Sequence, residues 1–396
     1  MSRVLFASTP AWGHVLPVLA GLAELGRRGH RVRALASPSF AAEIATAAEP
    51  VPYDSPMDAP GDVDLSDMTR VLPMMLGELR ASYAALDAAV RAERPDVVVA
   101  DVLAMSGWAL AEAHGLPLVR TWPVFASNSE FSLHEDYGSR RDTDAGRAEF
   151  FGGLAEFLGG VGLDPTAPQA AFDNVADRNI ALYPRELQPR GETFDERFTF
   201  VTPCIRAAEE SADAGWLRSA DPLAVVSLGT VFNERLDFFR TCLEAVAGIG
   251  WAAAAALGDR VRPEDVGTAS DRVLLRPRLP MIDALRHASV LVSHGGLTST
   301  IEALAHGVPV VIAPQIGEQE AVADSVVRLG LGARLTEPFT ADELVAVIRS
   351  VVEDPGTAER VARFRGRLTG GQRGSGFADA VERALLPGPL GAAARA

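Results

Sequence analysis

One short loop carries the strongest chemical signal in the chain. It follows an apolar run that predicts a buried strand, and it contains His294 and a Gly-Gly pair that ends at Gly296. Thr298 and Ser299 come where the next helix begins, so unpaired backbone N–H groups and the helix dipole favour an anion there. The glycines let the backbone approach a ligand closely, and His294 adds a side-chain donor. The combination favours phosphate binding, whereas His-Gly-Gly alone is more often an ordinary turn with Thr298 as a helix cap.

Three further polar side chains continue this pattern from phosphate to sugar. Glu302 lies one helical turn after Thr298, on the same face, within reach of hydroxyls beside a bound phosphate. Glu318 and Gln319 follow a second buried strand, at the carboxyl end where open α/β sheets bind ligands. A loop for phosphates, an acid for a ribose and an acid–amide pair for a second polyol together describe a nucleotide-diphosphate sugar.

A histidine and an aspartate at two other strand ends could form a proton-transfer pair. His14 comes in the loop after the apolar strand Val4–Ala7, and Asp101 follows the apolar strand Val97–Ala100. Each has a plainer interpretation, since such a histidine is often a structural donor and such an aspartate often caps the next helix. As a pair they suggest a base and the carboxylate that orients one imidazole tautomer, provided that the two loops are neighbours in space.

The donor motif resembles that of glycosyltransferase family 1. The resemblance rests on the run from His294 to Glu302, on Gly307–Pro309, and on Pro314 followed by Glu318 and Gln319. It is similar in particular to the macrolide-type antibiotic glycosyltransferases of bacteria, and it covers nearly the whole chain. It implies an α/β architecture of the GT-B type, in which two doubly wound Rossmann-like domains face each other across a cleft.

The resemblance also implies roles at the reacting centre. His14 would be the general base of an inverting hexosyl transfer, and Asp101 would assist it. Gly229 and Thr230, which follow a further apolar run, would help to hold the diphosphate. Together with the helix N-terminus and its histidine, they would stabilise the departing diphosphate in place of a metal.

The chain departs from its relatives where the family places the nucleobase. Family members usually carry tryptophan near Arg278 and glutamine or histidine near Met281. An arginine can stack on a base through its guanidinium plane, but with less area than an indole. Uridine and thymidine donors therefore both stay open. A UDP-hexose is favoured, because Glu318 and Gln319 suit a sugar with vicinal hydroxyls, and a dTDP-sugar is the alternative.

Aromatic and methionine side chains indicate where a large hydrophobic acceptor would bind. Residues 122–179 are rich in aromatics and contain helical runs that suit a lid-like segment over an apolar pocket. For any single side chain, core packing is the more common role. The predicted acceptor is a macrolide, a polyketide or another large apolar natural product. The candidate pocket residues are Trp12, Met74, Met75, Trp122 and Phe125.

Apolar runs alternate with amphipathic stretches in both halves of the chain, which is typical of doubly wound parallel sheets. We expect an N-terminal acceptor-binding domain over residues 1–205 and a C-terminal nucleotide-sugar-binding domain over residues 222–386. Residues 206–221 show little apolar periodicity and are expected to link the two domains. Residues 387–396 are expected to form a disordered tail.

The composition excludes several other classes of protein. A net charge of −15 at pH 7 argues against nucleic acid or an anionic membrane as a partner. All 37 basic residues are arginine, which excludes Schiff-base and pyridoxal phosphate enzymes, because both need a lysine amine. No signal-peptide pattern and no long apolar run is present, so a cytoplasmic location is expected.

Neither the cysteines nor the paired aspartates predict a metal site. Cys204 and Cys242 provide no zinc ligand set and no disulfide framework. Asp-x-Asp patterns at residues 62–64 and 142–144 lie in polar, turn-rich surroundings and are interpreted as solvated loops. No cofactor is expected besides the nucleotide sugar as co-substrate.

Two other interpretations stay open. A non-catalytic homologue that helps a partner transferase would share the fold, although it would not need His14 and Asp101. A sugar-nucleotide epimerase or a retaining transferase would keep the fold and change the reaction.

Overall fold

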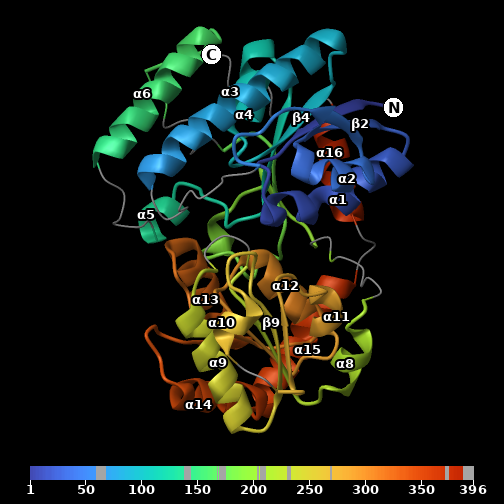
Figure 1. Ribbon diagram of the computed structural model, residues 1–396. Helices are drawn as coiled ribbons and strands as arrows, with labels where there is room; N and C mark the ends of the chain where they lie inside the picture. Colours follow the sequence, from blue (N-terminus) through green and yellow to red (C-terminus); the bar gives the residue numbers. More distant parts are fainter. Residues whose placement is uncertain are drawn as a thin grey trace.

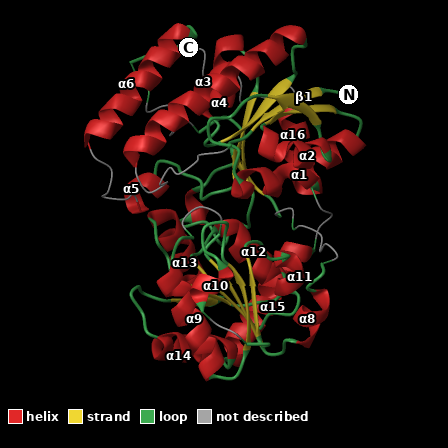
Figure 2. Cartoon of the chain, viewed as in Figure 1, coloured by secondary structure: helices red, strands yellow, loops and turns green. Residues whose placement is uncertain are grey.

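Two parallel β-sheets, each with helices on both faces, form the framework of the chain (Figures 1 and 2). The computed structural model describes residues 1–58, 68–137, 144–166, 168, 175–202, 205, 211–229, 233–267, 270–370 and 374–386. The strand pairs of both sheets are parallel, so the carboxyl ends of the strands share one edge in each sheet. The predicted α/β class with two doubly wound sheets is confirmed.

The N-terminal sheet has seven strands in the order β3-β2-β1-β4-β5-β6-β7. Its strands are β1 (Arg3–Ala7), β2 (Arg31–Ala36), β3 (Glu49–Pro52), β4 (Val97–Asp101), β5 (Leu118–Trp122), β6 (Asn179–Ala181) and β7 (Phe198–Phe200). Its helices are α1 (Trp12–Arg27), α2 (Ala41–Ala45), α3 (Met68–Ala92), α4 (Met105–His114), α5 (Leu133–Tyr137) and α6 (Asp144–Gly160), with short 3-10 turns η1 (Pro38–Phe40) and η2 (Gly191–Thr193). Since β1 lies between β2 and β4, the strand order reverses there, and such a switch point is where open sheets bind ligands.

The central strands of this sheet are covered on both faces, which explains their nearly continuous apolar sequences. One face packs under α1, α2 and α16 (Ser375–Leu385), where Phe6 and Val99 are fully buried. The other face packs under α3 and α4, where Leu86 and Leu110 are fully buried. α6 lies along α3 over a further apolar cluster (Figure 1).

The C-terminal sheet has six strands in the order β10-β9-β8-β11-β12-β13. Its strands are β8 (Leu223–Ser227), β9 (Ala252–Ala256), β10 (Val273–Arg276), β11 (Val290–Ser293), β12 (Val310–Ile312) and β13 (Gly332–Arg334). The helices around it are α8 (Ala214–Ser219), α9 (Leu236–Gly248), α10 (Pro263–Val266), α11 (Met281–Leu285), α12 (Leu297–Ala305), α13 (Gly317–Leu329), α14 (Ala341–Val352) and α15 (Pro355–Thr369). The order reverses between β8 and β11, so this sheet too has a switch point.

The last helix returns to the first domain. α16 lies beside α1 in the upper half of Figure 1, far from the helices that precede it in the chain. The Phe377 ring fills the space at Gly21, where an added Cβ would lie 2.4 Å from the ring. The expected domain division assigned residues up to 386 to the C-terminal domain, whereas α16 packs with the N-terminal one.

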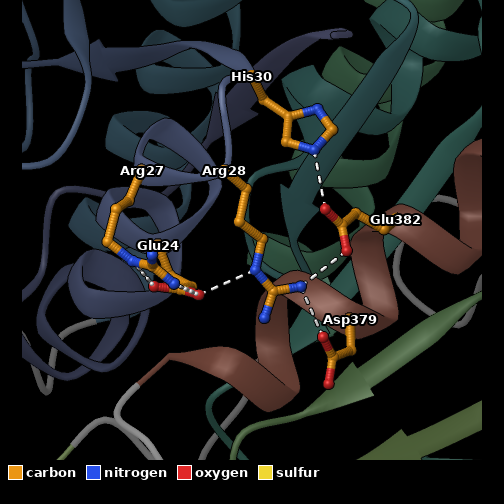
Figure 3. Close-up of polar contacts among 6 residues, drawn as sticks. All are labelled: Glu24, Arg27, Arg28, His30, Asp379 and Glu382. Atoms are coloured by element: carbon orange, nitrogen blue, oxygen red, sulfur yellow. Dashed lines mark hydrogen bonds and ion pairs between the residues drawn. The ribbon is translucent and has the colours of Figure 1, made fainter.

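Ion pairs surround this returning helix (Figure 3). Arg28, just after α1, donates to Asp379 and Glu382 of α16 across 2.6 and 2.7 Å. His30 Nε2 lies 3.0 Å from the second oxygen of Glu382, and Glu24 of α1 accepts from Arg28 at 2.8 Å. α16 is thus held on α1 by these ion pairs and by the buried Phe377 ring.

Some boundaries differ from the sequence expectations for identifiable reasons. The expected linker contains α8, and Leu217 of this helix is fully buried. The part of the linker that the structure describes therefore packs against the folded domains. α12 begins at Leu297, with Gly296 as its N-cap, so its start lies within a residue or two of the expected position. Residues 387–396, the expected tail, lie outside the described residues. Among the described helices, none is both long and apolar enough to cross a membrane.

Candidate active site

His14 and Asp101 lie side by side at the switch point of the N-terminal sheet. His14 is in the first turn of α1, and Asp101 is the last residue of β4. His14 Nδ1 lies 2.8 Å from Asp101 Oδ2, while Asp101 Oδ1 accepts from the Leu103 backbone N–H at 2.7 Å. With both carboxylate oxygens engaged, Nδ1 is the protonated nitrogen, and Nε2 keeps a lone pair that can accept a proton.

The charges around His14 favour its protonated form. Burial lowers the pKa of His14, but the charge and hydrogen bond of Asp101 and the more distant charge of Glu318 outweigh it, so the net shift is upward. Burial also raises the pKa of Glu318, and His14 partly opposes that shift. Glu318 belongs to α13 of the other domain, so a carboxylate from each domain raises the pKa of His14.

His294 lies at the corresponding switch point of the C-terminal sheet, between two glycines. A Cβ at Gly229 would lie 2.7 Å from the imidazole, and one at Gly296 would lie 2.9 Å from its Nε2. Burial lowers the pKa of His294 to about 4, although the nearby Ser227 carbonyl opposes this. The ring is therefore neutral at physiological pH and can offer an N–H donor rather than a positive charge.

The N-terminus of α12 faces the first domain. Thr298 and Ser299 occupy its first turn, as the sequence predicted, and Glu302 is buried on the same helix. A Cβ at Gly13 would lie 3.9 Å from Thr298 Oγ1, so the loop that carries His14 reaches this turn. The residues expected for phosphate and those expected for proton transfer therefore converge.

The acid–amide pair begins α13. Gln319 is buried, and its Oε1 accepts from the Gln315 backbone N–H at 2.7 Å, which closes the loop after β12. Gly317 contacts the Tyr137 carbonyl of the N-terminal domain so closely that a Cβ would lie 1.5 Å from that oxygen. The N-terminus of α13 thus lies against α5. About two turns further along α13, Asp324 accepts a hydrogen bond from Tyr137 Oη at 3.1 Å.

Two of the five expected acceptor residues are core residues. Trp122 is buried and donates through Nε1 to Asn179 Oδ1, and Phe125 packs edge-on against Tyr183. Both belong to an apolar cluster that continues into the C-terminal domain, so their aromatic faces are already covered. The aromatic content of this segment serves packing, the more common role that the sequence left open.

The other three acceptor candidates keep partial exposure. Trp12 begins α1 and stacks edge-on with Phe40, at a ring distance of 4.9 Å. Met74 and Met75 are half-buried on α3. These three side chains can still meet a ligand.

The base-site candidates do not resemble a stacking platform. The Arg278 side chain is 73% exposed and forms an ion pair with Asp259 at 3.0 Å. Met281 begins α11 and packs partly against the core. Thr230, the remaining diphosphate candidate, lies outside the described residues.

No metal-ligand cluster of three or more His, Cys, Asp or Glu side chains occurs among the described residues. The Asp-x-Asp pattern at 62–64 and most of the one at 142–144 lie outside them, as does Cys204. Cys242 is a buried free cysteine, and burial raises the pKa of its thiol.

Two residues near the site were not singled out from the sequence. Leu103, whose backbone N–H donates to Asp101, is 38% exposed and presents an apolar side chain beside this pair. Asn233 is buried, and its Nδ2 donates to the Gly229 carbonyl at 3.0 Å, which supports the glycine loop beneath His294. For Leu103, the only signal in the sequence is an apolar residue in the loop after a strand. For Asn233, the local sequence gives no signal.

Comparisons with known proteins agree over the length of both domains. The family described as "Erythromycin biosynthesis protein CIII-like, C-terminal domain" matches residues 241–369. NDP-glycosyltransferase YjiC of Bacillus licheniformis is 32% identical over 97% of this chain and 98% of its own. Demethyllactenocin mycarosyltransferase of Streptomyces fradiae is 33% identical over 98% of this chain and 87% of its own. The crystal structure of the glycotransferase of kitacinnamycin has a TM-score of 0.83 at 31% identity, over 97% of this chain and 99% of that one.

A likeness of this length includes both sheets and both switch points, and not a nucleotide-binding domain alone. The arrangement of the two sheets is the predicted GT-B fold. With a His–Asp pair on one sheet, a glycine-flanked histidine on the other and this identity throughout, the chain belongs to glycosyltransferase family 1, within the group of macrolide and other natural-product glycosyltransferases.

Proposed function

We propose that this glycosyltransferase is an inverting, metal-independent enzyme that moves a hexose from a nucleotide-diphosphate sugar to a hydroxyl of a large hydrophobic natural product. The observation that carries the proposal is the approach of the His14–Asp101 pair to the N-terminal turn of α12. The 3.9 Å separation between a Cβ at Gly13 and Thr298 Oγ1 supports a single reacting centre between the two domains.

The reaction assigns one task to each half of the molecule. His14 Nε2 accepts the proton of the acceptor hydroxyl as its oxygen forms a bond to the anomeric carbon. The bond from that carbon to the diphosphate oxygen breaks on the opposite face, and the nucleoside diphosphate leaves with the electron pair. Asp101 stabilises the imidazolium that forms, and it holds Nδ1–H throughout.

The departing diphosphate is stabilised by neutral donors. The backbone N–H groups of the first turn of α12 and the neutral imidazole of His294 can both donate to it. Activity should therefore survive excess chelator. Activity that returns only when magnesium or manganese is added would contradict this part of the proposal.

The sugar is proposed to be a fully hydroxylated hexose such as glucose, carried by UDP, with a dTDP-sugar as the alternative. Glu318 offers carboxylate oxygens, and Gln319, whose Oε1 is used by its own loop, offers its amide Nε2. A 2,6-dideoxy sugar would leave part of this pair without partners, at a cost of roughly 1–3 kcal/mol in a dry site.

A competition between a glucose donor and a 2,6-dideoxy donor tests this sugar assignment. We expect the glucose donor to win in the wild type and to lose most of its advantage in Gln319→Ala. The neighbouring Glu320→Ala is the control, because its side chain is turned towards Arg334. A deoxy sugar that wins, with no effect of Gln319→Ala, would refute the role of the pair.

The proposed acceptor class rests on partly exposed apolar side chains of the N-terminal domain. Leu103 lies two residues after Asp101, and Met74 and Met75 are half-buried on α3, so these three could give an acceptor an apolar and adaptable surface. A mycarosyltransferase and an oleandomycin glycosyltransferase of Streptomyces among the relatives support a macrolide-like acceptor. A helper protein or an epimerase would not need this lining.

Product stereochemistry tests the reaction type. With an α-linked UDP- or dTDP-glucose donor and a macrolide acceptor, the account predicts a β-linked product and an equimolar amount of nucleoside diphosphate. An α-linked product would indicate a retaining enzyme. Altered sugar nucleotide without acceptor transfer would indicate an epimerase.

A further inference from the structure

Arg120, in the middle of the apolar strand β5, is a fully buried arginine. Its relative exposure is 0%, and it is among the largest completely buried side chains of the described chain. Nη2 donates to the Val102 carbonyl at 2.6 Å, while Nε and Nη1 are buried without a hydrogen-bond partner among the described residues. Arginine is rarely buried in this way, because an ionised group loses its hydration inside a protein. A specific electrostatic role is therefore expected.

The charge nearest to this guanidinium along the sheet is that of Asp101. In the parallel pairing of β4 with β5, Ala100 is opposite Arg120 and Asp101 is opposite Thr121. The carbonyl that Arg120 holds belongs to Val102, the residue directly after Asp101. Among the described residues, no carboxylate lies within ion-pair distance of Arg120, so it acts on Asp101 through this backbone contact and across space.

The guanidinium keeps its charge in this setting. Burial lowers the pKa of Arg120 to about 10, and the negative charge of Asp101 opposes that shift. Arg120 is therefore cationic at neutral pH. The charged groups that face His14 are then Asp101 from β4 and Glu318 from α13, with Arg120 of β5 beyond Asp101.

We propose that Arg120 is a positioning residue for glycosyl transfer, which fixes the loop after Asp101 through the Val102 carbonyl and balances the charge of the buried Asp101 carboxylate. The inference rests on the proposed roles of His14 and Asp101 and deepens them. Arg120 touches neither substrate, since Asp101 and the Val102 backbone separate it from the imidazole.

Removal of the positive charge has a predictable sign. A positive charge beyond Asp101 should oppose a second positive charge on His14, so loss of the Arg120 charge should let His14 stay protonated to a higher pH. Arg120→Gln is therefore expected to shift the acidic limb of kcat/KM upward by about 0.5–1 pH unit. It should also lower kcat roughly 10- to 100-fold, because the loop after Asp101 loses its contact with Arg120 and no longer fixes the carboxylate. Arg120→Lys, which keeps the charge, should leave the limb in place and recover part of kcat.

A double-mutant comparison separates this role from a structural one. In an Asp101→Asn background, Arg120→Gln should lower kcat much less than it does in the wild type, because the carboxylate that the Val102 contact helps to position is already lost. Arg33→Gln is the matched control: this half-buried arginine of β2 also donates to a backbone carbonyl, and its loss should leave the limb unchanged. Urea unfolding followed by a probe in the N-terminal domain shows whether each variant is folded.

An unshifted limb in Arg120→Gln, or an equal loss of kcat with and without Asp101, would overturn the proposal. Should Arg120→Gln not fold, Arg120→Lys decides: a lowered kcat with an unshifted limb supports the proposal, and a wild-type kcat or an upward shift of the limb contradicts it. His14→Ala is assayed in parallel to keep the two claims separate. Wild-type transfer by His14→Ala would refute the proposed base itself. An inactive His14→Ala together with an unshifted acidic limb in Arg120→Gln would refute only this inference.

Discussion

Two carboxylates from different domains raise the pKa of His14, and this sets the pH range in which the proposed base would act. Asp101 and Glu318 together outweigh the effect of burial, so the pKa of His14 lies above its ordinary value. A general base works only when it is unprotonated, so activity is lost as pH falls through that pKa. The acidic limb of kcat/KM should lie above about pH 6.5, the ordinary value for imidazole.

The two carboxylates can be tested one at a time. Asp101→Asn and Glu318→Gln each remove a negative charge that favours the imidazolium, so each should move the acidic limb to lower pH. The shift should be larger for Asp101→Asn, which also lowers kcat because the orienting charge is lost. Measured pH profiles check this, with Glu320→Gln as the control on α13. A limb that moves upward in either variant would contradict the assigned electrostatics.

Residue chemistry was readable from the sequence where a strand end defined the position. His14, Asp101, His294 and Thr298 were found this way, because the carboxyl ends of parallel strands gather at one edge. Trp122 and Phe125 could not be separated from core residues, since composition does not show which face of a segment is covered. Arg120 was not singled out from the sequence, because its importance depends on its burial and on its contact with the Val102 carbonyl, which only the structure shows.

At the scale of elements, two glycine-containing loops enclose the imidazole of His294 in the proposed donor site. The loop after β8 and the loop after β11 place Gly229 and Gly296 on two sides of His294, and Gly229 has a positive φ of 72°. Asn233 anchors the first loop. Side chains larger than hydrogen at these two glycines would displace the ring.

Gly296→Ala should weaken nucleotide-diphosphate binding by disturbing His294. The new Cβ would lie 2.9 Å from Nε2, so the imidazole must move, and the proposed hydrogen bond from His294 to the diphosphate would weaken. A loss of about tenfold in affinity is expected, which corresponds to about 1.4 kcal/mol. Calorimetry with UDP checks it, and Gly366→Ala on α15, where a Cβ meets nothing within 4 Å, is the control. Equal affinity in the two variants would show that His294 does not contribute.

Most elements follow from local sequence, but their ends and some assignments do not. The apolar runs predicted the strands at β1, β4, β8 and β11 to within a residue or so, because buried parallel strands are continuously apolar. α8 was taken for linker, since its one buried turn is too short to show periodicity. Its place depends on the core of the C-terminal domain, which local sequence does not reveal.

At the scale of the whole molecule, the two domains are connected a second time by the last helix, α16, which packs on the N-terminal domain. α16 leaves the C-terminal domain and packs on α1, the helix that also carries His14. On the other side, α5 lies against α13, the helix that carries Glu318 (Figure 1). Sequence could not predict this crossing, because an amphipathic helix shows that it packs but not on which neighbour.

Phe377→Ala should destabilise the protein by releasing α16 from α1. The ring is 1% exposed and fills the space at Gly21, so truncation should cost about 3–5 kcal/mol. Urea unfolding followed by a probe in the N-terminal domain measures it. Leu386→Ala, at an exposed position just after α16, is the control and should change little. Similar stability of the two variants would show that the returning helix adds nothing to the first domain.

The most direct test of the account is the single-turnover rate of glycosyl transfer by His14→Ala at saturating donor. The account predicts a rate lower by about 100- to 10,000-fold, because the proton of the acceptor hydroxyl has no base to receive it. Affinity for the nucleoside diphosphate should be nearly unchanged, since that site belongs to the other domain. Transfer by His14→Ala at the wild-type rate would contradict the proposed chemistry.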